Sequence, residues 1–285
     1  MSELDPRTTP ARADLAAAHL RGKVKADRFA EGVVHHVVEA SAPVRHAPAP
    51  DAPLDSEVLH GEEVMIYETS DEGWCWGQIE RDGYVGYLPT NALKRGATGA
   101  THRIAALRTF VFPASDIKTP PIASLSFASR VKIVRNEKEF GVTNDGGFIP
   151  AIHLTPLAAL APDFVATARR FLGVPYLWGG RSSLGFDCSG LVQLSLQAAG
   201  VQCPRDSDMQ AKQGVEVPFS GDLKVLARGD LICWKGHIGL VAEGARLLHA
   251  NAFHMAVAEE PLAEAIARIK RSGSDVIAAR RLAKT

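Results

Sequence analysis

The residue best placed for chemistry in this sequence is Cys188, which directly follows Asp187. Apolar side chains recur after it with the period of a helix, and Gly200 is a typical stop for that helix. We therefore expect Asp187 to cap a helix that begins at Cys188, by accepting hydrogen bonds from the first-turn N–H groups. The helix dipole would lower the pKa of the thiol below its free value of about 8.5 and favour the nucleophilic thiolate. The alternative is a small buried hydrophobic residue, which describes most free cysteines.

Two histidines downstream are candidates for the base that such a thiol needs. Residues 230–241 have the pattern of two strands around a Lys-Gly turn, with His237 opening the second, and residues 247–251 predict a third strand. Because side chains alternate along a strand, His249 and Asn251 share one face. Pairing of the second and third strands would bring His237 beside His249 or Asn251. That arrangement gives a base next to the thiol and a polar group that orients the base.

Four short motifs follow one another along the chain: Tyr176-x-Trp178-Gly179-Gly180, Asp187-Cys188-Ser189-Gly190, Gly236-His237-Ile238-Gly239 and His249-Ala250. Together they resemble the NlpC-type (NlpC/p60-like) cell-wall peptidases, papain-like cysteine peptidases that cut bacterial peptidoglycan stem peptides. The resemblance implies that Cys188 is the nucleophile, His237 the general base and acid, and His249 the polar third residue. Histidine, asparagine or glutamine fills the third place in this family, so Asn251 stays an alternative. His254 lies beyond the strand pattern and is not assigned a role.

Residues close to the nucleophile are candidate substrate contacts. Tyr176 is either a core aromatic with a solvated hydroxyl or part of the site. The resemblance favours the site, since a tyrosine here lies beside the nucleophile, where its hydroxyl could help the Cys188 N–H bind an oxyanion. Asp187 is first of all a helix cap, and the resemblance adds that Asp187 and Ser189 line the substrate pocket.

A charged segment, residues 204–210, supplies three further candidates. It predicts the start of another helix, with Asp206 or Ser207 as the cap, and a solvated capping box would explain it without any function. The resemblance implies that Arg205, Asp206 and Ser207 hold the substrate. An acidic group here would suit the free ammonium of a stem peptide that begins with L-Ala, and uncleaved wall, whose L-Ala amine is blocked, would then be a poor substrate.

Tyr84 and Glu57 are candidates from outside the catalytic region. Relatives with an SH3-like domain over the site imply that this tyrosine and this carboxylate close one end of the cleft. Without that resemblance, Tyr84 is a barrel-surface aromatic and Glu57 a solvated charge.

The elements that carry these residues divide the chain into four parts. Residues 1–40 predict a polar arm with one helical piece around residues 12–20. Residues 41–97 and 98–158 predict two small all-β barrels, because Gly-aromatic and Pro-containing turns recur and residues 86–93 match residues 147–154. The pattern from Gly61 through Gly73-Trp74-Cys75-Trp76-Gly77 to Pro89 resembles a bacterial SH3-like domain, and the second copy is more divergent. Residues 159–285 place helices before strands, which predicts an α+β, papain-like peptidase domain with a mostly antiparallel sheet.

Composition limits the partners. The 285 residues carry 32 basic and 32 acidic side chains, so we expect neither nucleic acid nor membrane as a partner. The start of the chain lacks the pattern of a signal peptide, and no stretch reaches the ~20 apolar residues of a membrane helix. Four scattered cysteines without a CxxC pair predict no metal site and no disulfide scaffold, so Cys75, Cys203 and Cys233 are interpreted as structural. A cytoplasmic location is the simplest expectation.

The sequence thus predicts a cysteine endopeptidase that needs no cofactor. By resemblance, it cuts the gamma-D-glutamyl–diamino acid bond of free L-Ala-gamma-D-Glu-diaminopimelate or -lysine peptides in murein peptide recycling. Two alternatives stay open: a wall-peptide binding protein with a vestigial catalytic fold, and a thiol acyltransferase or amidase of the same superfamily. The third residue of the substrate and the oligomeric state are not predicted.

Overall fold

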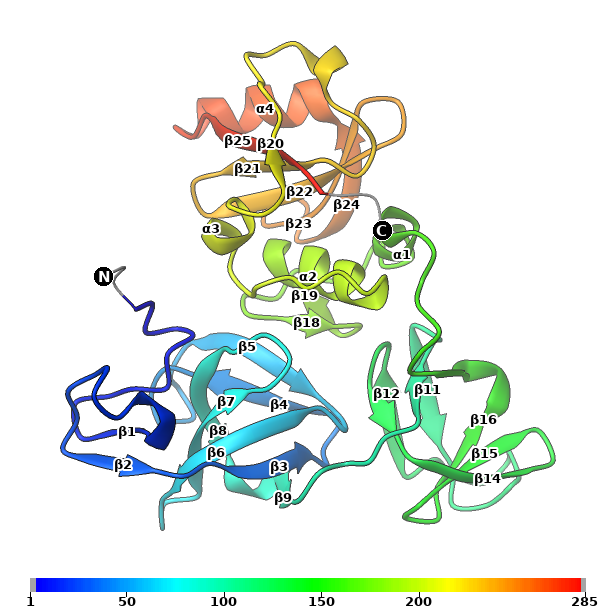
Figure 1. The fold of residues 1–285 in the computed structure, drawn as a ribbon. Helices are drawn as coiled ribbons and strands as arrows, with labels where there is room; N and C mark the ends of the chain where they lie inside the picture. The colour runs from blue at the N-terminus through cyan, green and yellow to red at the C-terminus, as the bar shows by residue number, and fades with distance from the viewer. Residues whose placement is uncertain (1–3, 283–285) are drawn as a thin grey trace. The chain divides into compact units, whose positions relative to one another are not determined.

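The chain divides into two compact units, residues 1–159 and residues 160–285. The computed structural model describes residues 4–282 (Figure 1). Its first unit is built almost entirely of strands, and its second combines helices with one large sheet. The mixed α and β content agrees with the predicted fold class. None of the described helices is long and apolar enough to cross a membrane.

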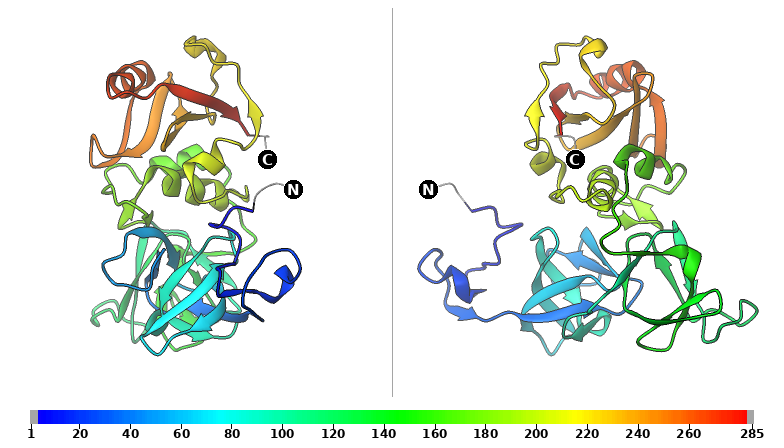
Figure 2. Two further views of the ribbon diagram at one scale, coloured as in Figure 1. Left: turned by 90° about the vertical axis from the view of Figure 1, so that its left-hand side faces the viewer. Right: turned by 45° about the vertical axis from the view of Figure 1, so that its right-hand side comes forward.

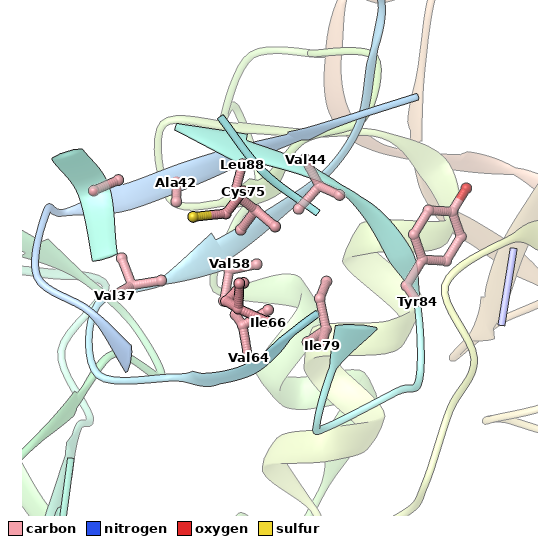
Figure 3. Packing of buried hydrophobic residues seen from close by; sticks show 11 residues of the cluster. Val37, Ala42, Val44, Val58, Val64, Ile66, Cys75, Ile79, Tyr84 and Leu88 are labelled. Carbon is pink, nitrogen blue, oxygen red and sulfur yellow. The ribbon is translucent and has the colours of Figure 1, made fainter. Parts of the chain in front are cut away.

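A seven-stranded antiparallel sheet forms the first β domain. From one edge to the other its strands are β5 (Leu54–Leu59), β4 (Ser41–Arg45), β8 (Val85–Pro89), β7 (Trp74–Ile79), β6 (Glu63–Thr69), β3 (Val33–Val37) and β9 (Leu93–Arg95). Buried and partly exposed residues alternate along β4 and β8, as expected for strands with one face on a core. That core is a cluster of small and branched apolar side chains with Tyr84 at one edge (Figure 3).

The N-terminal region differs from the predicted arm. Strand β1 (Leu15–Ala17) pairs in parallel with β2 (Arg28–Ala30), and only a 3-10 turn, η1 (Ala18–Leu20), replaces the expected helical piece. Strand β3 belongs to the seven-stranded sheet although it lies within residues 1–40. The physical reason is that a nine-residue helix is marginal on its own, whereas the extended chain buries Leu15 completely.

The second half of this unit contains three small antiparallel sheets. They are β13-β10-β17 (Arg130–Val131, His102–Ile104, Leu154–Pro156), β11-β12 (Arg108–Val111, Ala123–Ser126) and β14-β15-β16 (Ile133–Glu137, Phe140–Thr143, Phe148–Pro150). A separate apolar cluster that includes Ile104, Leu125 and Ile149 forms their core. The matching sequences have the same local structure: β8, η2 (Thr90–Ala92) and β9 in one copy, and β16, η3 (Ala151–His153) and β17 in the other.

The second unit is organised around a six-stranded antiparallel sheet. The strand order is β20 (Val215–Glu216), β25 (Val276–Arg281), β21 (Leu231–Trp234), β22 (His237–Ala242), β23 (Arg246–Asn251) and β24 (Ala256–Pro261). The remaining elements are α1 (Phe164–Arg169), the hairpin β18–β19 (Arg181–Ser182, Gly185–Phe186), α2 (Cys188–Ala198), α3 (Ser207–Gln210), η4 (Leu223–Val225) and α4 (Leu262–Arg271). Helices α2 and α4 lie on opposite sides of the sheet (Figure 2). Helix α2 contacts β22 and β23, the two strands that carry the candidate histidines.

Candidate active site

Helix α2 begins at Cys188 because Asp187 caps it, as predicted. One carboxylate oxygen of Asp187 accepts the N–H of Gly190 at 2.6 Å. Gly190 also permits a close approach by the preceding loop, since a Cβ at that position would lie 2.2 Å from the carbonyl oxygen of Gly180. The loop that starts at Tyr176 therefore lies directly against the first turn of the helix.

Three of the predicted substrate contacts form one buried polar network. The Arg205 guanidinium donates to both oxygens of Asp187, at 2.6 and 3.0 Å, and to the Ser189 hydroxyl at 2.8 Å. Arg205 is 1% exposed, and the second oxygen of Asp187 also accepts the Gly179 N–H. The network ties the loop, the helix start and residue 205 together, so it forms a rigid floor next to the thiol.

The Cys188 thiol is buried and held against the start of β22. Burial is the largest influence and raises the pKa of Cys188 to about 12, and the charge of Asp187 acts in the same direction. Hydrogen bonds at the backbone of Ile238 and Ser189 oppose this shift without overcoming it. The expected lowering of the thiol pKa by the helix dipole is therefore wrong for the resting site, because desolvation of the thiolate outweighs the dipole.

His237 and His249 lie together on neighbouring strands. Nε2 of His237 is 2.8 Å from Nδ1 of His249, and Nε2 of His249 is 2.8 Å from a carboxylate oxygen of Glu260. Arg268, on α4, donates to both oxygens of Glu260. The four side chains thus form a continuous hydrogen-bonded relay from the edge of the site into the protein. Glu260 and Arg268 were not predicted from the sequence.

The relay fixes the tautomers of both imidazoles. Although burial opposes it, hydrogen bonds from His249 and Arg268 lower the pKa of Glu260 to about 2, so Glu260 is a carboxylate and only accepts. Burial lowers the pKa of His249, and burial with the neighbouring His249 imidazole lowers that of His237 to about 3, so both rings are neutral near pH 7. His249 must then donate from Nε2 and accept at Nδ1 from the Nε2–H of His237. Nδ1 of His237 is left with its lone pair, ready to act as a base.

Neighbouring residues set the position of the two rings. The Trp234 ring lies 5.6 Å from the His237 ring, centroid to centroid. Gly239 leaves room for His249, because a Cβ at residue 239 would lie 2.6 Å from a methyl group of Leu247 and 3.0 Å from the Cβ of His249.

Tyr176 is half-buried near Cys188. Burial raises its pKa to about 12, and the nearby Cys188 and Asp187 add to this shift. The phenol therefore stays protonated and keeps an O–H that can donate to a developing oxyanion.

The remaining candidates in the second unit lie around this centre. Asp206 is the N-cap residue of α3, although its side chain does not cap the helix, and Ser207 is the first helical residue. Gln210 anchors α3 beside α2 by donating to the carbonyl oxygen of Ser189 at 3.0 Å. The amide oxygen of Asn251 accepts from the backbone N–H of His254 at 2.8 Å, and it is the imidazole of His249 that contacts His237.

Tyr84 and Glu57 belong to the first unit. Tyr84 is part of the apolar cluster of the first β domain (Figure 3). Glu57 accepts a hydrogen bond from the Ser41 hydroxyl at 3.2 Å. Their role at the site remains a prediction.

One group of side chains has the composition of a metal site. Ligand atoms of His249, His254 and Glu260 lie within 4.8 Å of one another. Both ring nitrogens of His249 and both oxygens of Glu260 already serve the relay. A metal here would therefore have to break it. The described centre instead combines a thiol, a neutral imidazole base and a group that orients the base. These are the groups that nucleophilic catalysis of acyl transfer requires.

Comparison with known proteins places this geometry in a family. Residues 173–270 match the NlpC/P60 family, and residues 44–93 match the bacterial dipeptidyl-peptidase SH3 domain. The gamma-D-glutamyl-L-lysine dipeptidyl-peptidase of Bacillus subtilis is 31% identical over 225 residues, which cover 70% of this chain and 73% of that protein. The protein of the same name from Bacillus cereus is 27% identical over 243 residues, which cover 73% of this chain and 71% of that protein.

The architecture agrees with a solved structure. An NlpC/P60 family protein from Bacillus cereus superposes with a TM-score of 0.71 over 87% of this chain and 99% of that chain, at 20% sequence identity. The predicted papain-like peptidase fold with an N-terminal SH3-like domain is thereby confirmed. The chain belongs to the NlpC/P60 family of cysteine peptidases.

Proposed function

We propose that this peptidase hydrolyses the gamma-D-glutamyl–diamino acid bond of free stem peptides such as L-Ala-gamma-D-Glu-L-Lys or its diaminopimelate counterpart. The observation that carries the proposal is the relay behind His237, which leaves Nδ1 free to act as a base, together with the buried Cys188 thiol at the backbone of Ile238, the next residue after His237. The names of the two Bacillus relatives supply the bond.

The chemistry uses Cys188, His237 and Tyr176. As the sulfur attacks the gamma-carbonyl carbon, Nδ1 of His237 takes the thiol proton, so charge appears only during the reaction. The Cys188 N–H and the Tyr176 hydroxyl stabilise the oxyanion. His237 then protonates the leaving amine as the C–N bond breaks and a thioester remains. Water, deprotonated by His237, hydrolyses the thioester and releases L-Ala-D-Glu and the thiol.

Recognition of the free amino terminus is the second part of the proposal. Asp187, Ser189 and Arg205 act as the floor of the pocket, because their mutual hydrogen bonds hold the surface on which the D-Glu residue lies. Asp206 and Ser207 bind the L-Ala end, with the Asp206 carboxylate facing the ammonium. A blocked amine would lose the ion pair.

A role in recycling follows from that specificity. Free amino termini occur on stem peptides that have left the glycan, and the four cysteines are free and buried, which suits a reducing compartment such as the cytoplasm.

The test is mass spectrometry of purified protein incubated with L-Ala-gamma-D-Glu-diaminopimelate, with the N-acetylated peptide and a Cys188→Ala variant run in parallel. We expect L-Ala-D-Glu from the free peptide only, and none from the variant. Equal cleavage of the acetylated peptide would contradict the proposed recognition of the amino terminus but would still support the peptidase activity. No cleavage of either peptide would favour a wall-peptide binding protein or an acyltransferase.

A further inference from the structure

A cavity of about 280 Å³ lies beside the imidazole of His237, within the second unit. Its walls come from the turn between β21 and β22, the end of β23 and the C-terminal half of α4. Apolar surface from Phe253 and Ile269 forms part of the wall, and the Arg268 guanidinium lies 4.2 Å from the Phe253 ring centroid. The mechanism proposed above assigns no role to this space.

The walls of this cavity contain hydrogen-bond donors that have no partner among residues 4–282. The Nε1 atom of Trp234, the Nδ2 atom of Asn251 and the hydroxyl of Ser274 are buried and unpartnered, and all three residues line the cavity. The Asn251 amide is oriented by its oxygen, which accepts from the backbone of His254, so its nitrogen is the unpaired end. Buried unpaired donors are unfavourable, and an acceptor-rich ligand would relieve them after a small side-chain adjustment.

The charge of the cavity points to an anion. Lys235 and Arg268 line it, and none of the described residues around it carries a carboxylate. Arg268 is neutralised by Glu260, whereas Lys235 is exposed in the turn that precedes His237. A ligand group with several acceptor atoms and a negative charge, such as a carboxylate, fits this set of donors.

The reaction supplies such a group at this place. In the proposed mechanism His237 protonates the amine of the leaving residue. In a tripeptide that residue carries a free alpha-carboxylate, whose oxygens lie roughly 3–4 Å from the amine by standard bond lengths. The carboxylate must therefore be close to the same imidazole that borders the cavity.

We propose that this cavity is the leaving-group subsite and that Lys235, with the donors of Trp234 and Asn251, binds the free alpha-carboxylate of the diamino acid. The proposal rests on the proposed function and narrows its substrates. Peptides that end at the diamino acid are preferred over peptides in which that carboxylate has become an amide.

Kinetics with two peptides test this preference. We expect L-Ala-gamma-D-Glu-L-Lys to exceed its C-terminal carboxamide about tenfold in kcat/KM, chiefly through KM, which corresponds to about 1.4 kcal/mol. Lys235→Gln should reduce the ratio to about one to two. Lys270→Gln is the matched control, because Lys270 is an exposed lysine of α4 that pairs with Asp275 and does not line the cavity. Its ratio should stay near tenfold. Equal rates for the two peptides with the wild type, or an unchanged ratio in Lys235→Gln, would overturn the proposal.

A binding measurement separates this proposal from the proposed function. In the Cys188→Ala protein, L-lysine should shift the indole N–H resonance of Trp234, assigned with a Trp234→Phe variant, and L-lysinamide at the same concentration should not. If this shift occurs but the wild type cleaves neither peptide, the carboxylate site stands and the substrate assignment fails. If L-lysine produces no shift, or both compounds shift the signal equally, the cavity does not recognise the carboxylate.

Discussion

Replacement of Glu260 by glutamine should inactivate the enzyme without removing any group that touches the substrate. Glu260 accepts from Nε2 of His249, and this acceptance makes Nδ1 of His249 an acceptor for His237. A glutamine that presents its NH₂ group to His249 reverses every bond in the chain. Nδ1 of His237 then carries the proton and can no longer take one from the thiol.

Arg268 makes that reversal the favoured arrangement. It donates to both oxygens of Glu260, and glutamine has only one oxygen to offer. If that oxygen stays with Arg268, the NH₂ group turns to His249. In serine peptidases a histidine held in the wrong tautomer lowers kcat by about 10⁴. Because the glutamine can rotate its oxygen back part of the time, we expect a fall in kcat of about 10² to 10⁴ here, with little change in KM.

The assay compares kcat and KM for the tripeptide in the wild type, Glu260→Gln and Glu259→Gln. Glu259 is the adjacent glutamate on β24 and pairs with Arg169 and Arg246, so its substitution removes the same charge outside the relay. Thermal unfolding of each variant establishes that the domain is folded. A Glu260→Gln enzyme within about threefold of the Glu259→Gln enzyme would refute the tautomer argument, since the charge change alone would then explain the effect.

Three further predictions follow from burial at the site. Because burial raises the pKa of Cys188 to about 12, the rate of its alkylation by iodoacetamide should keep rising with pH beyond about 9. Mass spectrometry of the modified peptide measures this rate, and a plateau below about pH 7 would contradict a neutral thiol in the resting site. The pKa of His237 is about 3 in the folded protein and about 6.5 in an unfolded chain, so the unfolded chain binds more protons between these values. The free energy of unfolding should therefore fall as pH drops from about 6.5 towards 3, and urea titrations should find a shallower fall in His237→Gln. Arg205→Met leaves the buried Asp187 carboxylate without its cationic partner and should lower the free energy of unfolding by about 3–5 kcal/mol. Arg169→Met, in a more exposed pair, should lower it by less than about 1 kcal/mol, and chemical denaturation measures both.

The parts of the site that could be predicted from the sequence depend on local signals. The cap at Asp187, the helical period after Cys188 and the Lys-Gly turn before His237 each act over a few residues, and the structure contains all three. Alternation along the third strand limited the partner of His237 to two residues, and the side-chain contact in the structure is with His249.

What the sequence did not predict depends on pairing between distant segments. Glu260 reaches His249 because β24 pairs with β23, with Ala258 opposite His249, and Arg268 then approaches from α4. Residues 255–258 are all apolar and precede both glutamates, but nothing local distinguishes Glu260 from Glu259. The pKa of Cys188 was mispredicted for the same kind of reason: the dipole belongs to one helix, while burial comes from the whole domain.

Gly190 has a consequence for attempts to engineer this enzyme. Glycine inside a helix is less favourable than alanine by about 1 kcal/mol, so a design based on helix propensity would select Gly190→Ala as a stabilising change. The added methyl carbon would lie 2.2 Å from the Gly180 carbonyl oxygen and would push the Tyr176 loop off the helix. Gly239 would behave similarly beside His249. In a saturation mutagenesis screen, both positions should therefore be as intolerant of substitution as Cys188, the proposed nucleophile, although neither has a role in the proposed reaction.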